Sequence, residues 1–227
     1  MQNVFYYLIY VPLYLLSLLP WRVLYCISDL FYLVLYYIVG YRKEVVMKNL
    51  SIAFPEKTDG QRISIAKEFY HNFLDSFIEM IKLIPISEKN FRKRVTSNIE
   101  VINDLKGIVP NVAVVSAHFF SWEFGNLAIS LESKFQFLGV YMPVKNKAID
   151  KIMYDLRTKF NAKLIAATDF RRQFIKYART NFSLGLISDQ NPGDPKFAYW
   201  IPFFGKLTPF VKGPEKSSFR SESPGAG

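Results

Sequence analysis

The first 40 residues carry two long apolar stretches. Residues 4–19 contain no charged side chain, and residues 23–41 contain only Asp29 before Tyr41. A helix that spans a bilayer needs roughly 20 apolar residues, so the first stretch is slightly short and the second is long enough. No basic residue precedes them and no small-residue cleavage site follows, which disfavours a secretory signal peptide. The pattern predicts a membrane anchor over residues 1–41, formed either by one spanning helix or by a pair of interfacial helices.

The remaining pattern changes once, near residue 110. Residues 42–110 are mainly helical in character, with apolar side chains at helical spacing over residues 60–84, where His71 is expected to be a half-exposed packing residue. Short apolar runs then alternate with amphipathic stretches. The runs lie at 113–117, 135–141, 164–167 and 184–188, and the stretches at 122–131, 148–160 and 170–179. This alternation predicts an α/β fold with a central mixed, partly parallel sheet flanked by helices over residues 111–216, followed by a polar tail at 217–227.

The charge is positive and unevenly spread. The chain has 29 Lys and Arg against 19 Asp and Glu, a net charge of +10, and the whole surplus lies on residues 41–227. Arg42, Lys43 and Lys48 follow the apolar stretches, and basic residues in such a position tend to stay on the cytoplasmic side. The body is therefore predicted to lie in the cytoplasm against an anionic membrane, anionic lipids or an acidic protein. A nucleic-acid partner is disfavoured because it would leave the apolar anchor without a role.

Composition excludes several classes of protein and site. Half of the residues are hydrophobic and 17% are aromatic, which excludes a disordered or fibrous chain. The single cysteine, Cys26, excludes an internal disulfide and a cysteine-rich zinc site. Two histidines, His71 and His118, are too few for an all-histidine metal site.

Residues 114–127, VVSAHFFSWEFGNL, are the strongest local signal for chemistry. A strand is predicted to end just before His118, and a helix can begin with Ser121 as its N-cap. Ligands of open α/β sheets bind outside the carboxyl ends of strands, where His118 would lie. Glu123 could bond one imidazole nitrogen while the other nitrogen takes a proton. The alternative is a structural histidine with a surface glutamate that suits the helix dipole.

The sequence offers no evident nucleophile for covalent catalysis. It has no Gly-x-Ser-x-Gly elbow, and Cys26 lies in the anchor. Neither a P-loop nor a dinucleotide fingerprint is present. The remaining interpretation is direct transfer, in which His118 deprotonates a hydroxyl of the substrate. Arg157 is a candidate for the positive group that a developing oxyanion needs, the alternative being an ordinary solvated helix charge.

Five segments occur in an order that is more specific than the histidine motif alone. They are YRKEVVMKNLSIAFPEKT (41–58), AHFFSWE (117–123), GVYMPVKNKAIDKIMYDLRTKF (139–160), SDQNPG (188–193) and WIPFFGK (200–206). In the first segment the signature residues are Arg42, Asn49, Leu50, Phe54 and Pro55. With this set the chain, to about residue 216, resembles the late acyltransferases of bacterial lipid A biosynthesis, the lauroyl/myristoyl transferase family of the lysophospholipid acyltransferase superfamily.

The resemblance implies an activity, partners and site residues. The protein would move a fatty acyl chain from an acyl-carrier-protein thioester, or acyl-CoA, to a hydroxyl of a lipid A precursor, without an acyl-enzyme. The reaction would take place on the cytoplasmic side of the bacterial inner membrane with an anionic glycolipid acceptor, and no metal or other cofactor is implied. The implied roles are general base for His118, orienter for Glu123, oxyanion or phosphate stabiliser for Arg157, and substrate binding for Asp189, Gln190, Trp122 and Asn126.

The chain departs from the family pattern in three respects. Phe120 and Ser121 stand where the family often has Gly and Asn, and Met142 stands where many members have Arg. Family members also continue well past the Pro-Phe-Phe-Gly segment, so the resemblance implies a core that is incomplete at its C-terminal end. Two alternatives therefore stand beside the lipid A interpretation. One is the same mechanism on a lysophospholipid, an aminolipid or another glycolipid, and the other is a truncated, inactive membrane-associated protein that binds lipid or carrier protein.

Overall fold

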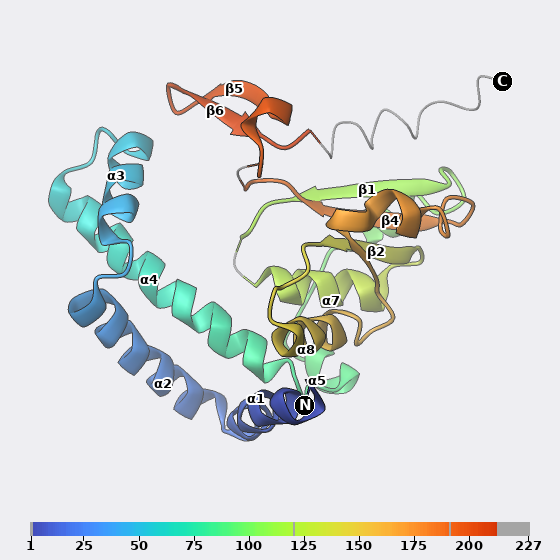
Figure 1. Cartoon of the computed structure of the whole chain (residues 1–227), viewed down its shortest axis with the longest axis horizontal. Helices are drawn as coiled ribbons and strands as arrows, with labels where there is room; N and C mark the ends of the chain where they lie inside the picture. The colour runs from blue at the N-terminus through green and yellow to red at the C-terminus, as the bar shows by residue number, and fades with distance from the viewer. Residues whose placement is uncertain (1, 120, 191, 213–227) are drawn as a thin grey trace. The chain divides into compact units, whose positions relative to one another are not determined.

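The computed structural model describes residues 2–119, 121–190 and 192–212 of the 227-residue chain. The chain divides into two compact units, Met1–Tyr10 with Ile86–Gly227, and Val11–Pro85. The first unit holds the sheet and the second is helical (Figure 1). The predicted polar tail at 217–227 lies outside the described residues.

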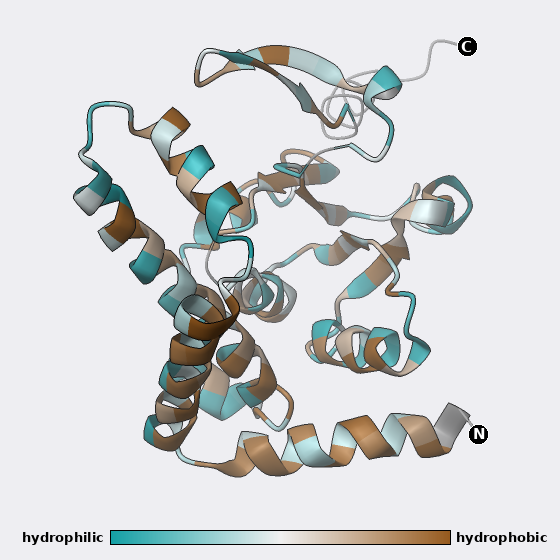
Figure 2. Cartoon of the chain, turned by 60° about the vertical axis from the view of Figure 1, so that its left-hand side comes forward, coloured by the Kyte–Doolittle hydropathy of each residue, from teal (hydrophilic) through white to brown (hydrophobic). Residues whose placement is uncertain are grey.

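The two apolar stretches form helices. They are α1 (Gln2–Leu18), which begins in the first unit and ends in the second, and α2 (Trp21–Leu33), which continues as the π-helix η1 (Val34–Val39). Figure 2 shows that α1, at the N mark, is mostly hydrophobic. Pro20, at the N-cap of α2, separates the two helices because it removes a backbone donor. Gly40, with φ 61°, ends the π-helix in the left-handed region that glycine adopts without strain.

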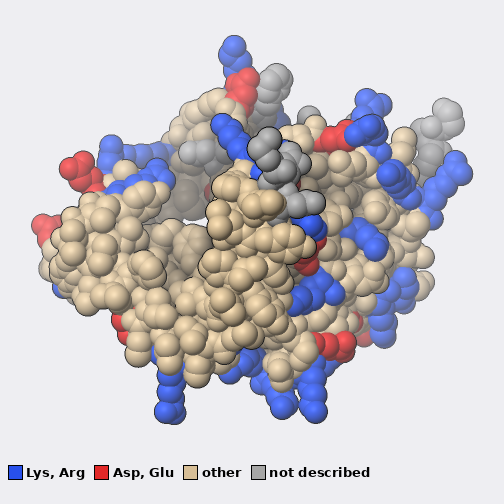
Figure 3. Space-filling model, turned by 60° about the horizontal axis from the view of Figure 1, so that its bottom comes forward, with Lys and Arg blue, Asp and Glu red and all other residues tan. Residues whose placement is uncertain are grey.

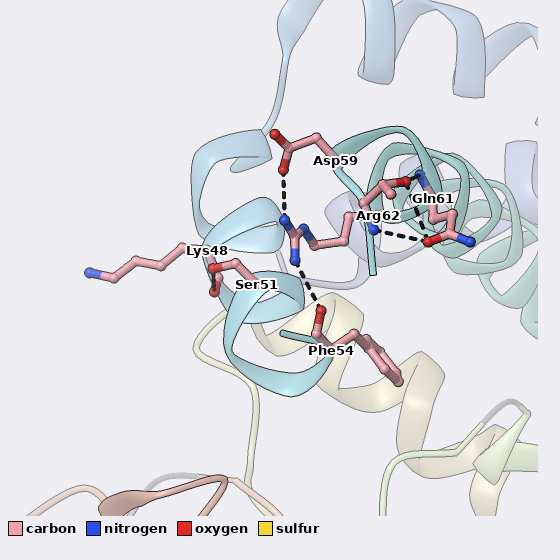
Figure 4. A network of polar contacts seen from close by, with 7 residues as sticks. Lys48, Ser51, Phe54, Asp59, Gln61 and Arg62 are labelled. Atoms are coloured by element: carbon pink, nitrogen blue, oxygen red, sulfur yellow. Dashed lines mark hydrogen bonds and ion pairs between the residues drawn. The ribbon is translucent and has the colours of Figure 1, made fainter. Parts of the chain in front are cut away.

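Two more helices complete the helical unit, α3 (Lys43–Ala53) and α4 (Asp59–Lys82). The helix predicted over residues 60–84 is α4, and it begins with a capping box between Thr58 and Gln61. Arg62 donates from Nη1 to the carbonyl of Phe54 at 3.0 Å and from Nη2 to Asp59 at 2.8 Å (Figure 4). The Phe-Pro part of the family signature therefore marks the end of α3, where one orphan carbonyl is satisfied by a side chain from the next helix.

The sheet unit is built on four parallel strands. They are β1 (Asn111–Ser116), β2 (Gln136–Tyr141), β3 (Lys163–Ala166) and β4 (Phe182–Ile187), in the spatial order β1-β4-β2-β3. Every pairing among them is parallel. The connecting helices are α7 (Trp122–Glu132), α8 (Lys147–Arg157) and the short α9 (Phe170–Phe174), and α5 (Glu88–Arg92) and α6 (Glu100–Asn103) precede the sheet. The predicted α/β fold with a parallel sheet flanked by helices is confirmed.

The two faces of the sheet have different roles. On one face Leu138, Ile165, Phe182 and Leu184 form a buried cluster, against which Phe170, Phe174 and Tyr177 pack. Because side chains alternate along a strand, Phe137 and Gly139 of β2 point to the other face, where α7 and α8 lie (Figure 1). The first face is a closed core, and the second borders the cavity described below.

The structure corrects one sequence-based expectation and adds one element that the sequence did not predict. The helix predicted over residues 170–179 ends at Phe174, the last residue of α9. The backbone then continues in turns, with Tyr177 N–H donating to Phe174 O at 2.9 Å. The Pro-Phe-Phe-Gly segment forms an antiparallel hairpin of β5 (Tyr199–Phe203) and β6 (Lys206–Phe210). Its two loop residues, Phe204 and Gly205, both have positive φ, the requirement of the tightest hairpin turns.

Candidate functional site

A cavity of about 820 Å³ opens at the carboxyl ends of the parallel strands. Its rim is formed by residues that follow β1, β2 and β4, and its wall by the first two turns of α7. Open α/β sheets bind ligands at this edge, and the volume is within the range of small-molecule sites. Of the residues predicted for the site, the lining includes His118, Trp122, Glu123, Asn126, Arg157 and Gln190.

His118 and Asp189 form the central polar pair. They follow the adjacent strands β1 and β4, whose register pairs Ser116 with Ile187, so residues two positions further along each strand come side by side. Asp189 Oδ1 lies 2.6 Å from His118 Nδ1, and Asp189 Oδ2 accepts a hydrogen bond from the His118 backbone N–H at 2.8 Å. The carboxylate thus holds both the ring and the backbone of His118.

The same contacts favour the ionised form of Asp189. Partial burial opposes ionisation of Asp189, but the backbone and ring hydrogen bonds of His118 outweigh it and hold the pKa of Asp189 below its usual value. An ionised carboxylate accepts the Nδ1 proton, which leaves the lone pair of the neutral imidazole on Nε2. The Nε2 atom lies 3.5 Å from Nε2 of Gln190, which also lines the cavity. His118 therefore presents its basic nitrogen to the cavity side.

Glu123 has a different partner from the one expected. Arg157, the last residue of α8, donates from Nη2 to Glu123 Oε1 at 2.6 Å and from Nε to both carboxylate oxygens at 3.1 and 3.0 Å. Among the described residues no hydrogen bond joins Glu123 to His118, so the predicted contact between them is replaced by His118–Asp189. The reason is that the register of β1 and β4 places the Asp189 carboxylate beside His118, while the end of α8 places the Arg157 guanidinium beside the Glu123 carboxylate.

The Glu123–Arg157 pair is largely enclosed. Glu123 is 4% exposed and the Arg157 side chain 22%, so Arg157 is not an ordinary solvated helix charge. The geometry is bidentate, which gives a strong and well-oriented ion pair. The Nη1 group of Arg157 makes no hydrogen bond among the described residues, although Arg157 lines the cavity.

Trp122 and Asn126 contact members of the His118–Asp189 and Glu123–Arg157 pairs. The indole of Trp122 donates to Glu123 Oε1 at 3.1 Å, and its ring meets that of His118 edge-on at 5.1 Å between centroids. Asn126 donates from Nδ2 to the Arg157 carbonyl at 2.9 Å, at the C-terminal end of α8. Both side chains therefore contact the proposed catalytic residues as well as the cavity.

Ser121 precedes α7 in an uncommon backbone conformation. It occupies the predicted N-cap position with φ 53°, and its side chain makes no cap hydrogen bond. Left-handed backbone favours Gly and Asn, and this is the position at which the family often has Asn. Phe120 lies outside the described residues.

Part of the cavity lining is apolar. Phe137, Ile129 and Leu164 contribute to its lining, together with Gly139 and Gly185, which face each other across β2 and β4. A Cβ added to Gly185 would lie 2.6 Å from the Phe137 ring. These residues were not predicted from the sequence, although the apolar runs that contain them were recognised as strands.

Tyr141 is a further lining residue that sequence reasoning missed. It ends β2, and burial, followed by the nearby Asp150, raises the pKa of its hydroxyl. The phenol therefore keeps its proton and can donate a hydrogen bond into the cavity. Its place at the carboxyl end of a predicted strand was the signal that could have identified it.

Lys and Arg side chains on the face drawn in Figure 3 are spread over several places and do not gather in one patch. Met142 lines the cavity and is exposed, at the position where many family members have Arg. Within residues 2–119, 121–190 and 192–212, no group of three or more His, Cys, Asp or Glu side chains is arranged to hold a metal ion.

Comparison with known proteins identifies the family. A family model described as bacterial lipid A biosynthesis acyltransferase matches residues 1–224. The lipid A biosynthesis acyltransferase 2 of Shigella flexneri is 26% identical over 157 residues, which cover 69% of this chain and 49% of that protein. The matched region thus spans about half the length of this curated relative. The chain belongs to the bacterial lipid A biosynthesis acyltransferase family.

Proposed function

We propose that the protein is an O-acyltransferase that moves a fatty acyl chain from a thioester donor to a hydroxyl group of a lipid A precursor. The observation that carries the proposal is His118, held at Nδ1 by Asp189, with Nε2 on the side of a cavity that is lined in part by apolar side chains. Family membership supports acyl transfer in lipid A biosynthesis. A base beside an apolar cleft suits a substrate that is part alcohol and part hydrocarbon.

His118 acts as general base and then as general acid. Its Nε2 takes the proton of the acceptor hydroxyl while the oxygen forms a bond to the thioester carbonyl carbon. The tetrahedral intermediate collapses, the carbon–sulfur bond breaks, and the imidazolium returns the proton to the departing thiolate. Asp189 stabilises the imidazolium between the two steps, the role predicted for Glu123 from the sequence.

Arg157 and Gln190 serve the developing negative charge. Arg157 keeps its positive charge while its Nε and Nη2 atoms bond Glu123, which leaves Nη1 for an oxyanion or a phosphate of the acceptor. The Gln190 amide, 3.5 Å from His118 Nε2, is placed to orient the attacking hydroxyl. Trp122 and Asn126 position these groups through the contacts described above.

The reaction is proposed to occur on the cytoplasmic side of the bacterial inner membrane. Support comes from the apolar N-terminal helices and from Arg42, Lys43 and Lys48 after them. An acyl carrier protein is the proposed donor partner, since it is acidic and the chain carries +10, and acyl-CoA is the alternative donor.

The test uses the full chain, purified in mild detergent, with acyl thioester donors and an under-acylated lipid A precursor. His118→Ala should lower kcat by about 10²–10⁴-fold. Asp189→Asn should lower it less and shift its pH profile, because the tautomer and the imidazolium lose their support. Asp155→Asn, which removes an exposed carboxylate paired with Lys151, is the matched control and should leave kcat unchanged.

Three outcomes separate the alternatives. Turnover on a lysophospholipid or aminolipid, with none on the lipid A precursor, would transfer the mechanism to another acceptor. Undiminished turnover by His118→Ala would exclude the assigned chemistry. No turnover on any acceptor by a folded chain that still binds lipid or carrier protein would favour an inactive binder.

A further inference from the structure

We infer that the helix Trp21–Val39, made of α2 and η1, lies along the surface of an anionic bilayer instead of crossing it. One face enters the boundary between headgroups and acyl chains, and the opposite face packs on α4. The inference rests on the proposed membrane setting and adds to it the manner of attachment.

Length and composition alone permit either arrangement. Among the described residues, Trp21–Val39 is the helix that is long and apolar enough to cross a membrane, with a mean hydropathy of 1.6 and 17% of the segment buried. Its 19 residues would extend about 28 Å at 1.5 Å per residue, close to the thickness of the hydrocarbon layer. The decision therefore depends on what the helix contacts.

Helix α4 runs antiparallel along most of this segment. The Tyr25 hydroxyl donates to Glu79 at 3.0 Å, Asp29 accepts from His71 at 2.8 Å, and the Tyr36 ring meets the Tyr70 ring at 5.3 Å. Near the end of η1, Lys67 lies 5.8 Å from the centre of the Tyr37 ring. The residue numbers of the contacts on α4 thus fall as those on α2 and η1 rise. These contacts form one continuous line between the two helices, called the seam below.

The α4 side of this seam is too polar for the hydrocarbon layer. Between residues 67 and 82, α4 carries the ionisable side chains of Lys67, Glu68, His71, Asp75, Glu79 and Lys82. If α2 crossed the bilayer with the seam intact, these groups would be carried to membrane depth, where ionisable side chains are rare and face the protein interior. Asp29 lies near the middle of the candidate span, yet 54% of its side chain is exposed, as is 43% of that of His71. A carboxylate exposed to this extent is costly in hydrocarbon.

The opposite face of α2 suits the membrane interface. At about 100° per residue, Val23, Leu30 and Phe31 lie between about 100° and 200° around the helix from Asp29, and they are 42%, 62% and 56% exposed. Exposed cations stand at both ends, Arg22 at the start and Arg42 with Lys48 beyond the end. An apolar arc beside a polar face, flanked by basic residues, is the pattern of a helix that lies in the plane of an anionic interface.

Single-cysteine labelling in inside-out inner-membrane vesicles tests the inference. In the full chain with Cys26→Ser, a single cysteine is placed at an exposed site near either end of the segment, as Arg22→Cys or as Tyr41→Cys. Ile175→Cys, at a position that is 72% exposed, is the reference in the sheet unit. A membrane-impermeant maleimide should label all three without detergent. Labelling of Arg22→Cys only after detergent disrupts the vesicles would overturn the inference.

Vesicle binding provides a second measurement. Lys48 extends away from the contacts at the start of α4 (Figure 4), so Lys48→Gln removes only a surface charge. Binding to phosphatidylglycerol-containing vesicles should weaken about fivefold, since a cation near an anionic surface contributes about 1 kcal/mol. Lys48→Arg is the charge-preserving control and should bind normally. Equal binding by Lys48→Gln and Lys48→Arg would contradict charge-assisted attachment.

Failure of the inference and failure of the proposed function are distinguishable. Acyl transfer in detergent micelles does not depend on how α2 meets a bilayer. Detergent-dependent labelling of Arg22→Cys together with His118-dependent turnover would refute the in-plane helix and leave the enzyme assignment standing. In-plane labelling without turnover would refute the enzyme assignment alone.

Discussion

The ion pair between Glu123 and Arg157 should be a principal source of stability for the sheet unit. Replacing Arg157 with Leu would leave an ionised carboxylate 4% exposed, with the Trp122 indole as its remaining hydrogen-bond donor among the described residues, at 3.1 Å. Removing one partner of a buried ion pair costs about 3–5 kcal/mol. Because the Arg157 side chain is itself 22% exposed, water can reach part of the site, and we expect a loss near 3 kcal/mol.

A second substitution separates this effect from lost packing. Glu123→Gln removes the stranded charge but keeps an oxygen that can accept from Trp122, so the double variant Arg157→Leu with Glu123→Gln should recover about 2 kcal/mol relative to Arg157→Leu. Leaving Trp122 as the only tryptophan, by Trp21→Phe and Trp200→Phe, makes urea unfolding followed by fluorescence report on the sheet unit.

Two results would refute this reasoning. One is a loss below about 1 kcal/mol for Arg157→Leu, the value typical of an exposed pair. The other is a double variant no more stable than Arg157→Leu, which would mean that the loss comes from packing and not from the unpaired charge.

Three further predictions follow from local geometry. Gly185→Ala brings a Cβ within 2.6 Å of the Phe137 ring and should lower the free energy of unfolding by about 1–3 kcal/mol through overpacking. Adding Phe137→Leu to the same chain should recover part of this stability in a thermal melt. A Gly185→Ala variant as stable as the native protein would contradict the close contact. The pKa of Asp189 is lowered in the folded protein, so its contribution to stability is present above its unfolded pKa of about 3.9 and is lost as pH falls through the folded value. The free energy of unfolding of Asp189→Asn should therefore approach that of the native protein in acid, and a gap that widens there would be inconsistent with this sign. Asn146→Ala removes the acceptor for the Ala148 and Ile149 amides at the start of α8 and should cost about 0.5–2 kcal/mol in urea unfolding, against no loss if the cap is not formed in solution.

Local patterns were sufficient for much of the fold. The helical spacing over residues 60–84 depends on side chains within a few positions of one another, and α4 has the predicted extent within two residues of its start and end. The apolar runs of the sheet unit likewise identified β1 to β4, because burial on both faces favours continuous apolar runs in parallel strands. His118 was placed at a strand end by the same reasoning.

Local patterns were insufficient where the backbone conformation or the end of a helix depends on distant residues. The hairpin of β5 and β6 turns at Phe204 and Gly205, and a Phe with φ 48° is not a residue that signals a turn. Helix α9 stops early because Phe174 and Tyr177 pack on the buried cluster of the sheet, a contact that its amphipathic pattern does not reveal.

By itself the sequence determined the four parallel strands, the helices α4, α7 and α8, and the family, because hydrophobic spacing and ordered motifs are properties of neighbouring residues. The tertiary structure alone decided which carboxylate serves which partner. His118 and Asp189 are 71 residues apart and meet only because β1 and β4 pair in one parallel register, while Glu123 meets Arg157 because α7 and α8 pack on the same face of the sheet. A register is the outcome of packing across the whole core, and no spacing along the chain encodes it.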